Sequence, residues 1–151
     1  MKSIETICSQ FVERCHDRGI RVTPQRLAVY RVLAADTSHP TAESVHDRLR
    51  KDMSSLSLAT VYRILEALKC EGLVRRVSTT DSAGRFDANV APHQHAVCRV
   101  CGTMTDLEDG RYAPAGIPRN LPGGFEPEEL DIRIIGICAS CRGARKRRRG
   151  K

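Results

Sequence analysis

The sequence predicts an α+β fold in which an N-terminal winged helix-turn-helix domain precedes a small α/β dimerisation domain. Apolar residues recur at helical spacing in four segments before Gly72. The stretch "LVRRVSTTDSAGRFDA" that follows is typical of two short strands joined by a turn at Asp81–Gly84. Two C-x-x-C pairs then occupy the C-terminal half. The expected parts are residues 1–84 (DNA-binding domain), 85–142 (metal-binding dimerisation domain) and 143–151 (a basic disordered tail).

The first two helices have clear boundaries. Apolar residues at helical spacing predict a helix over residues 4–18, which Gly19 ends. In "GIRVTPQR", Thr23 is the expected N-cap of the second helix and Pro24 its first residue, because proline has no N–H to lose there. This helix is expected to end near Asp36.

Two more helices follow. "SHPTAESVHDRLR" opens the third, with Thr41 as its N-cap. Ser57 caps the fourth, which runs through "SLATVYRILEALKCEG" and stops at Gly72. Short helices followed by a hairpin are the order of elements in a winged helix-turn-helix domain.

Composition narrows the possible partners. The 151 residues carry a formal net charge of +7, which favours an anionic partner, nucleic acid before membrane. No apolar run approaches the ~20 residues that a bilayer span needs, and the N-terminus lacks a secretory apolar region. We therefore expect a cytoplasmic protein without membrane association, in which the seven cysteines stay reduced.

The fourth helix is the expected DNA-reading helix, because the second helix of such a turn lies in the major groove. Its N-terminal end offers hydroxyls for phosphates and Tyr and Arg side chains for bases. An ordinary helical domain with a solvated basic face is the alternative, and the order of elements favours DNA binding over it. The candidate DNA contacts are Arg21, ahead of the second helix, and Ser57, Thr60, Tyr62 and Arg63.

The two C-x-x-C pairs predict a structural zinc site, because two such pairs supply the tetrahedral all-thiolate shell that zinc favours. The intervening residues 102–137 exceed the usual spacing of ~15–20, so a strand or helix must be looped out. A redox dithiol or four buried thiols are the alternatives. The expected ligands are Cys98, Cys101, Cys138 and Cys141, whereas Cys8, Cys15 and Cys70 are expected to be small core residues.

A second metal site is expected beside the first cysteine pair. His93 and His95 alternate on a predicted strand, so their rings point to the same side. Asp87 and Asp106 lie at the ends of neighbouring predicted strands that can converge on the histidines. A lone histidine is usually a packed or surface residue, and this alternative stays open.

The motifs "VTPQR", "HPTAESV", "SLATVYRILEAL", "RFD", "HQHAVCRVCG" and "GICASC" resemble the ferric uptake regulator (Fur) superfamily over roughly residues 10–142. The resemblance implies a homodimeric, metal-dependent repressor that binds a double-stranded DNA operator and is not an enzyme. It also implies a fifth regulatory ligand, His39 of "SHPT". A metal-dependent hydrolase and a zinc-ribbon interaction module are the rival interpretations, but no general base, nucleophile pair or phosphate loop supports the hydrolase.

Within the superfamily, the ligand set is most similar to the peroxide-sensing branch. Iron-sensing members usually have Glu at the positions of Asp87 and Asp106 and a histidine run HHDH, where this chain has Pro92–His95. An iron-responsive repressor is the alternative. Three imidazoles and two carboxylates suit Fe(II) or Mn(II). The resemblance implies that peroxide oxidises a histidine ligand of the Fe(II) form, with His39 and His93 as candidates.

Two segments depart from the family pattern. Residues 107–130 carry four prolines where a dimerisation helix is usual, so any helix there must be short. The dimer can then rest mainly on the sheet, and the choice between helix and sheet stays open. The tail "RGARKRRRGK" is a run of like charges, which is expected to be disordered and to attract DNA phosphates without sequence preference.

Overall fold

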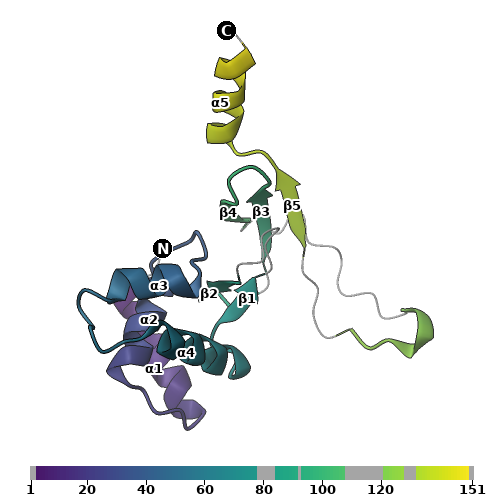
Figure 1. Cartoon of the computed structure of the whole chain (residues 1–151). Coiled ribbons are helices and arrows are strands. Elements are labelled where there is room, and N and C mark those ends of the chain that lie inside the picture. The colour runs from purple at the N-terminus through teal and green to yellow at the C-terminus, as the bar shows by residue number, and fades with distance from the viewer. Residues whose placement is uncertain (1–2, 78–83, 92, 108–120, 128–131, 150–151) are drawn as a thin grey trace. The chain divides into compact units, whose positions relative to one another are not determined.

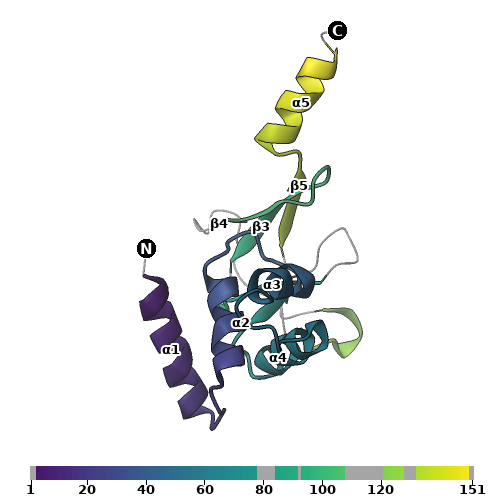
Figure 2. The same cartoon turned by 60° about the vertical axis from the view of Figure 1, so that its left-hand side comes forward.

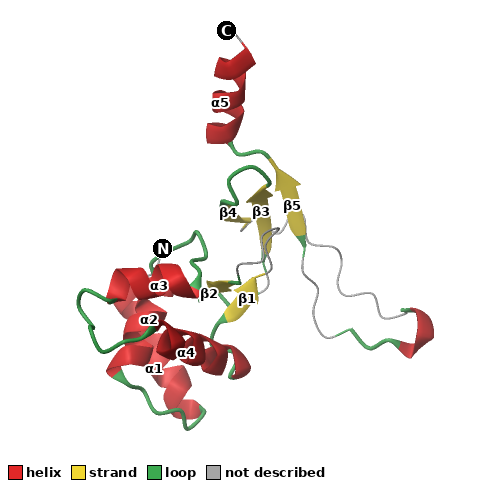
Figure 3. Ribbon diagram, in the orientation of Figure 1, coloured by secondary structure: helices red, strands yellow, loops and turns green. Residues whose placement is uncertain are grey.

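The structure, a computed structural model, describes residues 3–77, 84–91, 93–107, 121–127 and 132–149, with side chains described as far as residue 144 (Figure 1). The chain divides into two compact units, Met1–Ala91 and Pro92–Lys151. Among the described residues, the first unit contains four helices and a two-stranded sheet, and the second contains a three-stranded sheet, which confirms the α+β class (Figure 3).

The division between the units lies after Ala91, whereas the sequence predicted it after residue 84. The strand at Arg85–Asp87 pairs with Arg75–Val77 and is therefore part of the first unit. The hairpin of a winged domain needs both of its strands, so this difference follows from the hairpin itself.

The four helices of the first unit begin where the sequence predicted. In each case a Ser or Thr side chain accepts a hydrogen bond from the backbone N–H three residues later, which satisfies one orphan donor of the first turn. Thr23, Thr41 and Ser57 are thereby confirmed as N-caps. The helices are α1 Ile4–Asp17, α2 Pro24–Ala34, α3 Ala42–Leu49 and α4 Leu58–Cys70.

The apolar faces of these helices form one core. Phe11 of α1 stacks on Tyr30 of α2, with ring centroids 3.9 Å apart, and both side chains are buried. Arg14 donates a hydrogen bond of 2.8 Å to the Tyr30 hydroxyl, so the polar end of that buried ring is satisfied. Figure 2 shows α1 lying alongside α2. Phe86, from the hairpin, completes the core from the sheet side.

Helix α4 ends in a left-handed glycine. Gly72 has φ +65°, and the Leu73 N–H donates to the Leu68 carbonyl at 2.9 Å, which is a Schellman cap. The chain then enters β1 (Arg75–Val77) and returns in β2 (Arg85–Asp87), antiparallel, with Arg75 opposite Asp87. The expected turn at Asp81–Gly84 lies, apart from Gly84, outside the described residues.

In the second unit, β3 (Gln94–Cys98) is the central strand. It pairs antiparallel with β4 (Met104–Leu107) and parallel with β5 (Arg133–Gly136). Within the described part of residues 107–130, the only helix is the single turn η1 (Pro122–Gly124). A short helix was expected there, because prolines remove helix donors.

The C-terminal tail differs from the sequence prediction. Helix α5 spans Ala139–Arg149, so residues 143–149 are helical rather than disordered. Ala, Arg and Lys have high helix propensity, and cations near a helix C-terminus interact favourably with the helix dipole. These preferences outweigh the repulsion between like charges on which the prediction rested.

The three cysteines outside the C-x-x-C pairs occupy different environments. Cys15 is fully buried in the core of the first unit, as predicted, and this burial raises the pKa of its thiol. Cys8 is half-buried. Cys70 is exposed, so the expectation of a core position was wrong for this residue. It lies two residues beyond the buried Leu68, which places it about 200° around the helix.

Candidate metal centres and recognition helix

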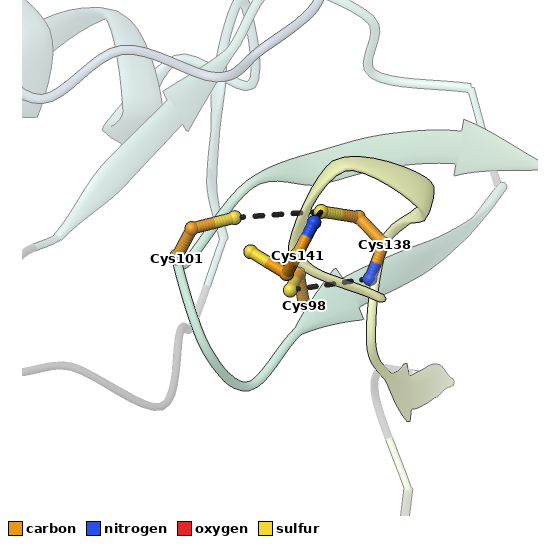
Figure 4. A group of neighbouring side chains, drawn as sticks. All are labelled: Cys98, Cys101, Cys138 and Cys141. Atoms are coloured by element: carbon orange, nitrogen blue, oxygen red, sulfur yellow. Dashed lines mark hydrogen bonds between the residues drawn. The ribbon is translucent and has the colours of Figure 1, made fainter. Parts of the chain in front are cut away.

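The four paired cysteines come together at one end of the second unit. Cys98 ends β3 and Cys101 lies in the β3–β4 turn, while Cys138 and Cys141 lie at the start of α5 (Figure 4). Their four Sγ atoms lie within 4.8 Å of one another, and those of Cys101 and Cys138 are 3.7 Å apart. Four thiolates at 2.3 Å from one tetrahedral zinc ion have sulfurs about 3.8 Å apart.

Strand register explains how two distant sequence motifs meet. The parallel pairing of β3 with β5 places Cys98 opposite Gly136, two residues before Cys138. The β3–β4 turn closes through Gly102, whose φ is +71° and whose N–H donates to the Cys98 carbonyl at 2.8 Å. The 102–137 stretch contains β4, η1 and β5, so its length does not separate the two pairs.

Backbone amides point at the sulfur atoms. The Cys138 N–H donates to the Cys98 Sγ at 3.3 Å, and backbone donors of this kind lower the pKa of Cys98 to about 6. The Cys138 Sγ accepts from the Cys141 N–H at 3.5 Å, so it serves as a sulfur cap for α5. The Thr103 side chain lowers the pKa of Cys101.

The same cluster resists carrying four negative charges without a cation. Its sulfur neighbours, Cys138 first, raise the pKa of Cys141 to about 12. A divalent cation replaces the protons and neutralises the thiolates, so the donor set fits zinc. No coordination position is left for a substrate in such a closed shell.

A second group of donors lies in the second unit, at the other end of β3. His95 on β3 stands directly opposite Asp106 on β4, and His93 precedes the strand on the same face. The Nε2 atoms of His93 and His95 lie 3.4 Å and 3.6 Å from the same carboxylate oxygen of Asp106. The imidazole rings meet edge to face at 4.5 Å. Two imidazoles and one carboxylate thus converge, with both rings largely buried.

The other two expected regulatory ligands lie together in the first unit. His39, in the loop between α2 and α3, has its Nδ1 3.7 Å from Oδ1 of Asp87, which ends β2. Both side chains are buried, and His39 is only 1% exposed. Asp87 also accepts a 2.7 Å hydrogen bond from the Asn89 N–H. A buried carboxylate beside an imidazole is a donor pair that fits Fe(II) or Mn(II).

Helix α4, the expected DNA-reading helix, presents its N-terminal end to solvent. Ser57 and Thr60 share a hydrogen bond of 2.9 Å between their hydroxyls, and Arg63 donates to the Thr60 hydroxyl at 3.1 Å. Tyr62 is 41% exposed, and its hydroxyl donates to the Glu43 carboxylate of α3 at 2.5 Å. Arg21 is exposed ahead of α2. The predicted DNA contacts therefore lie at or near the surface, and three of them, Ser57, Thr60 and Arg63, are joined by hydrogen bonds.

Three residues near these sites were not selected from the sequence. Thr103 contacts the Cys101 sulfur, Glu43 holds Tyr62, and Arg85 donates to the carbonyl of His39. For Arg85 the sequence contained a usable signal, because it alternates with Asp87 on a strand and must share its face. Glu43 and Thr103 depend on tertiary proximity, for which the sequence gives no spacing rule.

The family model for the ferric uptake regulator family matches residues 17–115. The chain belongs to this family. It is 31% identical over 141 residues to the peroxide-responsive repressor PerR of Staphylococcus aureus (strain Mu50), covering 93% of this chain and 95% of that protein. Proteins of the Fur family are transcriptional regulators rather than enzymes. They are metal-responsive, bind DNA and form dimers.

Solved structures share the fold of this Fur-family chain. The Helicobacter pylori ferric uptake regulator Fur matches with a TM-score of 0.68 at 21% identity, covering 93% of this chain and 95% of that chain. A zinc uptake regulator in complex with zinc and DNA matches with a TM-score of 0.70 at 24% identity, covering 97% and 99%. None of the helices in the described residues combines the length and apolar character of a membrane span.

Proposed function

We propose that this Fur-family regulator is a repressor that senses hydrogen peroxide. In the proposed cycle, a homodimer binds a double-stranded DNA operator while its regulatory site holds Fe(II) or Mn(II), and peroxide releases the Fe(II) form. The protein acts in the cytoplasm, where its operator lies. The proposal is supported by the 31% sequence identity between this chain and the peroxide-responsive repressor PerR of Staphylococcus aureus.

The proposed regulatory site takes its ligands from both units. The first unit supplies a buried imidazole and carboxylate, and the second supplies two imidazoles and a carboxylate. An ion bound by both sets would restrict the angle between the units and so set the dimer for DNA. The proposed ligands are His39, Asp87, His93, His95 and Asp106, and a separate structural zinc is proposed at Cys98, Cys101, Cys138 and Cys141.

The observation that carries this proposal is a donor set of nitrogen and oxygen without sulfur. Such donors suit Fe(II) and Mn(II), and the five proposed residues would hold either ion. When held by these residues, Fe(II) would supply the redox chemistry through which peroxide oxidises an imidazole ligand. An oxidised His39 or His93 would then be a poorer ligand. The units would no longer be held at one angle.

The DNA-contacting end of the proposed repressor is the start of α4. Arg63 has donors for a bidentate base contact, and Tyr62 is exposed beside it. The hydroxyls of Ser57 and Thr60 face solvent near the helix N-terminus, where phosphates are favoured. Arg21 is proposed to contact a phosphate or the minor groove from its exposed position ahead of α2.

The proposed dimer contact is the free side of the second-unit sheet. In the described part of the chain, β5 pairs on one side only, with β3. Its residues Ile134 and Ile135 are 41% and 56% exposed, which is unusual for neighbouring isoleucines on an edge strand. A second copy that pairs with this edge would cover part of this exposed apolar surface.

The deciding experiment compares two metal forms of the zinc-loaded dimer on operator DNA. Dilute peroxide should release the Fe(II) form and leave the Mn(II) form bound. Mass spectrometry should then find one added oxygen on a peptide containing His39 or His93, and thiol reductants should not restore binding. If peroxide leaves the Fe(II) form bound and only iron removal releases it, the protein is an iron-responsive repressor instead.

A further inference from the structure

Arg85 lies on the strand that carries a proposed metal ligand, and its role is not explained by the ligand set. In β2 the side chains alternate, so Arg85 and Asp87 share one face and Phe86 takes the other. Phe86 is buried in the core of the first unit. The opposite face of β2 therefore presents a guanidinium and a carboxylate together, toward the loop that precedes α3.

That loop is attached to β2 along its backbone. The Phe86 N–H donates to the Pro40 carbonyl at 3.1 Å, and Thr41 forms a bridge with Arg85. The Arg85 Nη1 donates to the His39 carbonyl at 3.2 Å and more weakly to the Ser38 carbonyl at 3.5 Å. One side chain thus holds two successive carbonyls of the loop.

The backbone that Arg85 holds is strained. His39 has φ +54°, and it is the only non-glycine residue with a positive φ in the described part of the chain. A residue with a β-carbon adopts this conformation only when its surroundings enforce it. At the other end of the loop, Asp36 accepts from the Ser38 N–H at 2.7 Å and contacts Arg48. The loop is therefore fixed at both ends, with His39 between them.

We propose that Arg85 is a positioning residue for the regulatory metal, which keeps His39 in its left-handed conformation with its ring beside Asp87. The inference rests on the proposed function, because it concerns two of the proposed ligands. Fixing both ligands before the metal arrives lowers the entropy cost of binding. A rival role is purely electrostatic: a guanidinium near a cation site weakens metal binding, so its removal would strengthen it.

The two roles predict opposite results in the full-length, zinc-loaded protein. Arg85→Lys keeps the charge and loses the planar fork, and Arg85→Met loses both. If Arg85 positions the ligands, both variants should bind Mn(II) about 10–100-fold more weakly, as measured by competition with a chelating indicator. Arg76→Met is the matched control, because Arg76 lies opposite Phe86 in the same hairpin and is exposed. Its Mn(II) affinity should equal that of the wild type.

A second measurement follows the loop without metal. Arg85→Lys should speed the hydrogen exchange of the Phe86 amide, which bonds to Pro40, and leave the amide of Leu65 in the core of α4 unchanged. Wild-type Mn(II) affinity in Arg85→Lys, tighter binding in Arg85→Met, or unchanged exchange at Phe86 would each overturn the inference. If the wild-type protein itself binds no Mn(II), the proposed function fails rather than the role of Arg85 alone.

Discussion

The two candidate metal centres differ in how their ligands are distributed along the chain. All four cysteines belong to the second unit, and β3 and β5 bring them together in a fixed register. The five nitrogen and oxygen donors are divided, with His39 and Asp87 before the unit boundary and the others after it. A site contained in one unit can stabilise that unit, whereas a site with ligands in two units can report on their arrangement.

The two candidate metal centres also differ in the chemistry of their donor atoms. Four thiolates form a closed shell that holds zinc strongly and leaves no position open. Imidazoles and carboxylates bind Fe(II) or Mn(II) more weakly and exchange them more readily. If the proposed function holds, one small protein separates the metal that stabilises its fold from the metal that it senses. The predictions below test this separation.

The largest expected effect is the loss of the cysteine site. Cys98→Ser should lose zinc and the folded second unit together, because the binding free energy of structural zinc is about 10–16 kcal/mol and is also folding energy. Metal content per chain and sedimentation of the dimer measure this result. Cys70→Ser, at an exposed thiol outside the cluster, should keep zinc and dimer. A Cys98→Ser variant with full zinc content would remove the distinction between the two centres.

The next effect concerns the sensing site. Asp106→Glu moves the carboxylate one methylene further from the backbone, at a position where it lies beside both His93 and His95. The variant should still bind DNA with metal, but its Fe(II) form should respond to peroxide roughly 10²-fold more slowly, because reacting atoms are misplaced by about 1 Å. The rate of DNA release after peroxide is the measurement. A wild-type rate would contradict the assigned role of this carboxylate.

A smaller effect is expected at the reading end of the first unit. Arg63→Ala should weaken operator binding by about 1–3 kcal/mol and relax base preference if Arg63 makes a bidentate base contact. Removing residues 143–151, which carry six Lys and Arg residues, should instead weaken binding to all sequences and flatten the salt dependence. Binding to operator and random DNA over a salt series separates the two. Should the truncation alter base preference more than Arg63→Ala, the reading helix has been assigned wrongly.

The smallest effect separates charge from position at Glu43. Glu43→Ala removes the acceptor for the Tyr62 hydroxyl and should lower operator preference by about 0.5–1 kcal/mol. Glu43→Gln keeps an acceptor oxygen and should retain that preference, while binding random DNA slightly more tightly because a negative charge is gone. Equal losses of preference in both variants would show that only the charge matters. Binding to operator and random duplexes, each measured for both variants, gives the answer.

Local rules predicted the first unit well. The Ser57 cap, the Pro24 start and the Gly72 stop each depend on neighbouring residues, and all three are confirmed. The spacing of the C-x-x-C pairs likewise predicted which four cysteines meet. What the sequence did not predict depends on distant contacts. The strand register that aligns Cys98 with Gly136 is one case, and the support that Arg85 gives to the backbone of His39 is another.

Helix α5 shows a second reason why prediction from the sequence failed. Its like charges predicted disorder, yet the helix starts at the cysteine cluster, where the Cys138 sulfur caps its first turn. The propensity of Arg, Lys and Ala for helix then continues it. The charge repulsion could be predicted from the sequence. The helix cap could not, because it depends on the position that the strands give to Cys138.

The environment of the tyrosines gives the protein an intrinsic optical probe. The chain has three tyrosines and no tryptophan, so its ultraviolet emission comes from phenol rings alone. Tyr30 is stacked and buried in the core, whereas Tyr62 is exposed and its hydroxyl donates a hydrogen bond to a carboxylate. Replacing Tyr30 and Tyr112 by Phe would leave Tyr62 as the sole fluorophore. Operator binding could then be followed in solution, without a label, by light emitted at the proposed contact itself.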